Sequence, residues 1–152
     1  MPVDPLTITP TVVQVAALIR NRTINRLGKE VGTFDATTRP TLAEAEPLIA
    51  RAARYVSISI GERFDDWPPA LVETAKDAAA SFAALYIEQG FYADGSNGDH
   101  TPADQLGRIA REQLGALLRD AGRGRLMRSI QLTDPADTRS DDDDLPWLSR
   151  SI

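Results

Sequence analysis

The stretch Leu71–Gly90, LVETAKDAAASFAALYIEQG, decides the fold of this chain. Apolar side chains recur in it at steps of three and four residues, which is the spacing of one helical stripe: Leu71, Ala75, Ala78, Phe82, Leu85 and Tyr86. The stretch is also rich in alanine, which lets neighbouring helices approach closely. The pattern therefore predicts a central helix over residues 69–89, packed on several sides, with Gly90 as the left-handed residue after its last turn.

Three further segments show the same helical period, at residues 11–21, 42–60 and 102–121. Thr9 or Thr11 is placed to cap the first of them, and the Thr41-x-x-Glu44 spacing is that of a capping box. Pro47 conflicts with the second helix, so that helix either starts late, at Glu46, or is bent by the proline. The sequence predicts an all-α fold, a small bundle of about four helices.

The composition of the 152 residues limits the classes of function. The chain has no cysteine, which excludes disulfides, a thiolate metal site and a thiol nucleophile, and its single histidine argues against a histidine metal site. The net charge of −5 does not favour attraction of the whole protein to nucleic acid. No apolar run approaches the length of a membrane span, and we expect no secretory signal in the first residues.

A basic segment follows the first helix. The glycines in Thr23–Phe34, TINRLGKEVGTF, favour a short hairpin or compact loop over a helix. Four cations gather in and beside it: Arg20, Arg22, Arg26 and Lys29. They indicate either a solvated loop or a contact with an acidic partner surface or with phosphate. We predict that this loop lies at an interface or lumen, so that changing Arg22 and Arg26 to Glu should leave the monomer folded.

Both ends of the chain are predicted to be arms, residues 1–10 and 122–152, around a helical domain of residues 11–121. The first ten residues carry three prolines and indicate an extended arm. After Ala121 we expect a glycine hinge at Gly122–Gly124, a short strand over 126–132, and an acidic run, Asp141–Asp144, before an apolar end. The alternative is a free acidic tail. The residues of this arm that we expect to contact a partner are Arg123, Arg125, Arg128, Leu145, Trp147 and Leu148.

A search for catalytic or cofactor-binding motifs finds none: there is no phosphate-binding glycine loop with lysine, no G-x-S-x-G and no H-E-x-x-H. Glu88 and His100 flank one loop, where hydrogen bonding is a better explanation than acid–base chemistry. The acidic residues of segment 94–99 lack the spacing and closing glutamate of a calcium-binding EF-hand. We expect no enzyme activity, cofactor or metal.

The order of these segments resembles the head-to-tail adaptor (connector) proteins of long-tailed bacteriophages, especially those of actinobacteria. The short helix leads into a basic loop and Gly32-Thr33-Phe34, then into Arg39-Pro40-Thr41 and an apolar helix that ends at Gly61. The later run AALYIEQGFYAD is similar to the alanine-rich helix of that family and the aromatic-acidic loop after it. The resemblance covers about residues 12–120, and Pro47 departs from it.

The resemblance implies a non-catalytic virion subunit that forms a ring of twelve copies beneath the portal. Its partners would be other copies of itself, the portal and the stopper or tail-completion proteins, with genomic DNA passing through the lumen and no membrane contact. The C-terminal arm would dock on an adjacent ring, the portal, with Trp147 in a pocket. The subunit would be in the host cytoplasm during assembly. Two other classes remain open at this stage: a small helical DNA-binding regulatory module, and a small enzyme with a site around Glu88.

Overall fold

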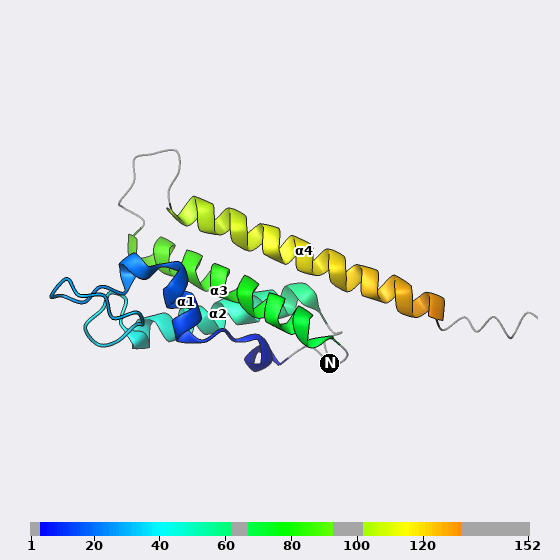
Figure 1. The fold of residues 1–152 in the computed structure, drawn as a ribbon, viewed down its shortest axis with the longest axis horizontal. Helices are drawn as coiled ribbons and strands as arrows, with labels where there is room; N and C mark the ends of the chain where they lie inside the picture. Colours follow the sequence, from blue (N-terminus) through cyan, green and yellow to red (C-terminus); the bar gives the residue numbers. More distant parts are fainter. Residues whose placement is uncertain (1–3, 62–66, 93–101, 132–152) are drawn as a thin grey trace, which may run out of the picture. The chain divides into compact units, whose positions relative to one another are not determined.

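The computed structural model describes residues 4–61, 67–92 and 102–131, with the backbone alone for Tyr92 and residues 121–131. Within these residues there are four α-helices and no strand, which confirms the all-α prediction (Figure 1). The helices are α1 (Val12–Leu18), α2 (Leu42–Ile60), α3 (Pro69–Tyr92) and α4 (Pro102–Gln131), and two short 3-10 helices are η1 (Pro5–Ile8) and η2 (Arg20–Arg22). The chain divides into a compact first unit that ends at Arg119 and a second that begins at Asp120.

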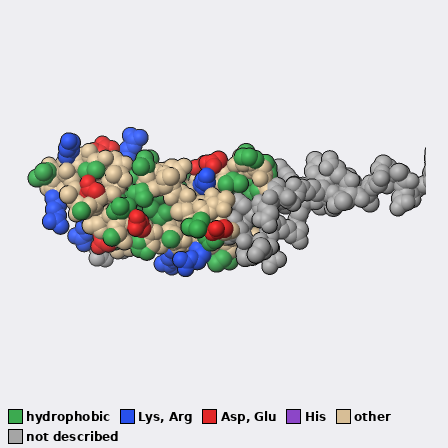
Figure 2. All heavy atoms as spheres, turned by 90° about the horizontal axis from the view of Figure 1, so that it is seen from below, with side chains coloured by type: hydrophobic (Ala, Val, Ile, Leu, Met, Phe, Trp, Pro, Cys, Tyr) green, Lys and Arg blue, Asp and Glu red, His purple; other side chains and the backbone are tan. Residues whose placement is uncertain are grey.

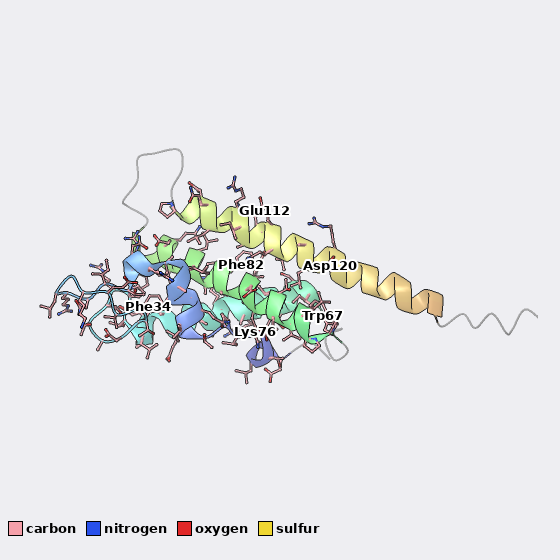
Figure 3. All side chains as sticks on the ribbon, viewed as in Figure 1. Phe34, Trp67, Lys76, Phe82, Glu112 and Asp120 are labelled. Atoms are coloured by element: carbon pink, nitrogen blue, oxygen red, sulfur yellow. The ribbon has the colours of Figure 1, made fainter. Side chains whose placement is uncertain are left out.

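Helix α3 is the centre of the first unit, as the alanine-rich stretch predicts. Every residue from Ala78 to Leu85 is buried, which means that α3 is covered around its whole circumference there. Helices α1, α2 and η1 all contact it. Phe82, labelled midway along α3 in Figure 3, packs edge-on against Tyr55 of α2, with their ring centroids 4.9 Å apart. Burial of each large apolar side chain in such a core contributes about 1.5–3 kcal/mol.

Helix α2 begins at Leu42 with the predicted capping box. The Thr41 N–H donates to Glu44 Oε2 at 2.8 Å, and the Thr41 hydroxyl donates to the same oxygen at 2.9 Å. The helix occupies the predicted range, 42–60, so of the two alternatives at Pro47 the late start at Glu46 is excluded, and Pro47 lies inside the helix. The helix ends at Ile60, and the next residue, Gly61, has a φ of 76°, a left-handed value that favours glycine.

The N-terminal segment differs from the extended arm that its prolines indicate. Asp4 caps η1 by accepting a hydrogen bond from the Leu6 N–H, and Ile8 is wholly buried against the core. Thr11 then caps α1 in a capping box with Gln14, which selects it over Thr9. The helix ends at Leu18, three residues before the predicted boundary, because the chain leaves helical geometry at Ile19 (φ −130°) and enters η2.

Helices α3 and α4 are both longer than predicted, because glycine did not end either helix. Gly90 lies inside α3, and Gly122 and Gly124 lie inside α4. The predicted glycine hinge is wrong, and so is the predicted strand, since the backbone is helical from 126 to 131. Glycine costs only about 1 kcal/mol in a helix interior relative to alanine, which good helix formers on both sides offset.

Within the first unit, the part of α4 up to Arg119 packs on α3. Ala110, Leu114 and Leu117 are buried, and the Ser81 hydroxyl donates to Gln113 Oε1 at 2.7 Å. A Cβ added at Gly107 would lie 3.6 Å from Leu85 Cδ1. Higher numbers on α4 therefore meet lower numbers on α3, so the two helices run antiparallel.

Candidate interaction surface

The predicted hairpin is present between α1 and α2, as a closed loop over Thr23–Val31. The Asn25 N–H donates to the Lys29 carbonyl at 2.9 Å, the Val31 N–H donates to the Thr23 carbonyl at 2.9 Å, and Ile24 and Glu30 form an isolated antiparallel bridge. We call residues 20–31 the basic hairpin. Its register is fixed by these backbone bonds, so its outer side chains have defined places.

Asn25 closes the tip of the basic hairpin. Its side-chain oxygen accepts hydrogen bonds from the Leu27 N–H at 3.0 Å and the Lys29 N–H at 2.9 Å. The Gly28 N–H donates to the Asn25 carbonyl at 2.9 Å, which closes a four-residue turn, and Gly28 has φ 77°. Asparagine at the first position and glycine at the fourth are typical of such turns. The tip is thus held by its own backbone.

An ion pair anchors the base of the hairpin to the central helix. Arg22 Nε donates to Glu88 Oε1 at 2.8 Å and Arg22 Nη2 donates to Glu88 Oε2 at 2.9 Å. Glu88 is 3% exposed, so its carboxylate depends on this partner. Beside it, the buried Thr23 hydroxyl donates to the Arg20 carbonyl at 2.8 Å. The bidentate geometry fixes the direction as well as the position of the hairpin base.

The segment that leaves the hairpin is equally well fixed. Gly32 turns the chain with a φ of 75°. Phe34, which is labelled beside the loops in Figure 3, is buried. Asp35 Oδ1 accepts from the Thr37 hydroxyl at 2.7 Å and from the Thr37 N–H at 2.6 Å. These hydrogen bonds, the hydroxyl one foremost, lower the pKa of the Asp35 carboxyl. Anchors on both sides therefore leave the tip as the projecting part.

The tip presents an apolar side chain among cations. Leu27 is 91% exposed and Ile24 is 45% exposed. Arg20, Arg26 and Lys29 are also exposed, with Glu30 as the one exposed carboxylate of the basic hairpin. Figure 2 shows several Lys and Arg side chains at its left, on the side where Figure 1 draws the loops after α1. Leu27 is the most exposed large apolar side chain among the described residues, which makes the tip a candidate contact surface.

The predicted partner-contacting residues fall into four groups. Arg20, Arg26 and Lys29 are exposed on the basic hairpin, as an interface requires. Arg22 instead holds the fold together, because its guanidinium is bound to Glu88. Arg123, Arg125 and Arg128 lie on the α4 backbone, and their side chains are outside the described ones. Leu145, Trp147 and Leu148 lie outside the described residues, as do His100 and the segment 94–99.

Two important residues were missed by the sequence reasoning. Glu88 was paired with His100, whereas it binds Arg22. Its position four residues after the buried Ala84 was an available signal, since a carboxylate on a buried face requires a cation or donors. The second is Leu27, for which the sequence yielded no prediction. The turn residues Asn25 and Gly28 on either side were the signal that it lies at an exposed tip.

Other chemistry in the described part of the chain is sparse. No group of three or more His, Cys, Asp or Glu side chains among the described residues is placed to hold a metal ion. None of the helices, over the residues described, combines the length and apolar character that a bilayer crossing requires.

Arg51 lies 4.9 Å from the ring centroid of Tyr86. Burial raises the pKa of the Tyr86 hydroxyl, and the positive charge of Arg51 opposes this shift.

Comparison with known proteins adds no family to these observations. No protein-family model, no curated protein and no solved structure matches this chain.

Proposed function

We propose that this chain is a structural head-to-tail connector subunit of a long-tailed bacteriophage, which forms a ring beneath the portal and lets DNA pass to the tail. The proposal rests on the pattern of segments over residues 12–120 and on the all-α fold that this resemblance implies. In this proposal the subunit acts in the virion, is present in the host cytoplasm during assembly, and carries out no catalysis.

The observation that carries the proposal is the basic hairpin. A structural subunit needs contact surfaces whose shape exists before the partner arrives, because ordering a loop on binding costs free energy. Asn25, Gly28 and the Arg22–Glu88 pair provide that order, and Leu27 with Arg26 provides the contact. The partners in this proposal are other copies of the chain, the portal, and stopper or tail-completion proteins.

The charge of the chain also suits the proposal. A lumen that releases DNA must not bind its phosphates tightly, and duplex affinity grows with the number of phosphates neutralised by Lys and Arg. The subunit carries a net charge of −5, and three of its exposed cations lie together on the basic hairpin. This distribution favours protein contacts at the hairpin over binding of DNA along the whole surface.

Electron cryomicroscopy of particles assembled from the genome that encodes this chain tests the proposal. We expect a closed ring of density between portal and tail into which the four helices fit in repeated copies. Mass spectrometry of the same purified particles should detect the chain in the ratio of a ring subunit. Absence of the chain from the particles, or its presence only elsewhere in them, would overturn the proposal.

One observation favours the DNA-binding alternative, namely the three exposed cations of the basic hairpin, Arg20, Arg26 and Lys29. A duplex-binding titration over a salt series separates the two functions. A regulatory module would bind duplex tightly, with an affinity that falls steeply as salt rises. A connector subunit should show weak binding without sequence preference.

A further inference from the structure

The exposed tip of the basic hairpin has the character of a protein-binding surface more than a phosphate-binding one. A phosphate backbone offers nothing apolar for Leu27, which is 91% exposed, or for the half-exposed Ile24. A partner that matches both features must bring carboxylates for Arg20, Arg26 and Lys29 and an apolar group for Leu27. Complementary charge with an apolar anchor is the usual composition of a specific contact.

The chain contains a segment of that composition in its own sequence. Residues 141–148 read DDDDLPWL, four consecutive carboxylates followed by Leu145, Pro146, Trp147 and Leu148. This segment lies outside the described residues, and its sequence alone is used here. The aspartates match the cations of the basic hairpin, and Trp147 is the side-chain type that most often dominates such contacts.

The direction of α4 favours a second copy as the donor of this segment. The basic hairpin is bound at Glu88, near the C-terminal end of α3. Gly107 of α4 lies beside Leu85, and Gln113, further along α4, is hydrogen-bonded to Ser81, which is further from Glu88. The part of α4 that belongs to the first unit therefore starts near the hairpin of its own subunit and leads away from it.

We propose that segment Asp141–Leu148 of one copy docks on the basic hairpin of a second copy, with the aspartates against Arg26 and Lys29 and Trp147 against Leu27. Such a contact joins two different surfaces, so it repeats from copy to copy and closes into a ring when the rotation allows. The inference rests on the proposed function for its ring, and it names the subunit–subunit contact. It assigns to this segment a place on a neighbouring copy, where the sequence alone indicated the portal.

A peptide of residues 138–152, titrated into the full chain carrying Trp147→Ala, tests the contact without any phage partner. We expect NMR shift changes at the amides of Arg26, Leu27 and Lys29, and binding that weakens as salt rises because charges are screened. Arg26→Glu with Lys29→Glu, added to the same chain, should weaken peptide binding by about tenfold or more, as at interface hot spots. Arg54→Glu with Arg108→Glu is the matched control, since it changes the net charge equally at exposed sites on α2 and α4, outside the basic hairpin.

Mixing two full-length variants then tests whether the contact is made between copies. One variant carries Arg26→Glu with Lys29→Glu and keeps its tail, and the other carries Trp147→Ala and keeps its hairpin. Each should sediment as a monomer when alone, and the mixture should form a one-to-one pair, because only one productive contact remains.

Three results would overturn the inference. The first is the absence of NMR shift changes at the hairpin amides at millimolar peptide. The second is an equal loss of peptide binding in the Arg54→Glu, Arg108→Glu control. The third is a failure of the two full-length variants to form a pair. Shifts of the hairpin amides on addition of duplex DNA but not of peptide would assign the surface to phosphate instead. Each measurement is made on the purified chain, so failure here is distinct from absence of the chain from the virion.

Discussion

Arg22 and Glu88 lie 66 positions apart in the sequence, and two hydrogen bonds of 2.8 and 2.9 Å join their side chains. The pair connects the base of the basic hairpin to α3, the central helix of the first unit. It makes the placement of an exposed contact surface depend on the core. A change at either residue is therefore expected to affect both the stability of the fold and the position of the hairpin.

Arg22→Ala should lower the free energy of unfolding by about 2–4 kcal/mol, because it leaves the Glu88 carboxylate buried without its cation. The value lies below that of a wholly buried pair because the Arg22 side chain is 23% exposed. Chemical denaturation measures the change. Arg108→Ala is the matched control, since the Arg108–Glu112 pair is exposed on both sides and should contribute less than about 1 kcal/mol. Equal effects of the two substitutions would contradict the structural role of Arg22.

Phe82→Ala should cost about 3–5 kcal/mol of stability, since it removes a buried aromatic ring and leaves a cavity. Phe82 is 5% exposed and contacts Tyr55 and Tyr86. Thermal or denaturant unfolding measures the loss, and Leu27→Ala at the exposed tip should stay within about 0.5 kcal/mol of the wild type. A loss well under 1 kcal/mol for Phe82→Ala would show that the ring is not part of a packed core.

Two charge-reversal variants of the basic hairpin should differ in folding. Arg26→Glu with Lys29→Glu alters exposed side chains, so the far-UV circular dichroism and unfolding midpoint should match the wild type. Arg22→Glu with Arg26→Glu should instead be strongly destabilised, because it sets a second carboxylate against buried Glu88. The sequence alone led us to expect a folded monomer from this second variant, and the ion pair reverses that expectation. Similar midpoints for the two variants would refute the distinction.

The capping box of α2 should make stability depend on pH in the acid range. Hydrogen bonds from Thr41, first its backbone N–H and then its hydroxyl, lower the pKa of Glu44 from its ordinary 4.5. A carboxyl with a lowered pKa in the folded state stabilises above its unfolded pKa and loses that contribution as pH falls through the folded pKa. Thr41→Val removes the hydroxyl donor, so an NMR titration should find the Glu44 pKa moved up towards 4.5. An unchanged pKa would mean that the hydroxyl does not act on the carboxylate.

A chain that ends at Gln131 should fold like the full chain, because it retains all of α4 and every described residue of the first unit. Differential scanning calorimetry should find the same unfolding midpoint for both. A chain cut after Ala121, at the boundary that the sequence suggested, ends inside the helix instead. If removal of residues 132–152 lowers the midpoint by several degrees, that segment contributes to the fold.

The sequence predicted those features that depend on local periodicity and capping. The four helices, the Thr41–Glu44 box and the glycine stop at Gly61 all follow from residues within a few positions of one another. Glycine gave the correct boundary at Gly61, where φ is 76°, and the wrong one at Gly90 and Gly122, which stay helical. Glycine permits a left-handed end without requiring one, and the neighbouring helix formers decided the outcome.

Contacts between distant segments were beyond the sequence reasoning. The local pattern around Glu88 points to His100, twelve residues away, while its partner comes from a loop between α1 and α2. Likewise the prolines of the first ten residues indicate an extended arm. Ile8 is instead buried in the core, so packing against distant residues determined the path of residues 4–10. The exposed cations of the hairpin were found because charge and glycine are visible in sequence. The distinction between Arg22 and Arg26 required the fold.

The turn at the tip of the hairpin separates the residues that build it from those that contact solvent. Backbone groups and the Asn25 side chain close it, and Gly28 supplies the left-handed step. The side chains of Arg26, Leu27 and Lys29 are therefore replaceable in sequence without rebuilding the loop. Divergence between related subunits, or protein engineering, can therefore change partner preference at three positions of one turn while folding stability stays nearly constant.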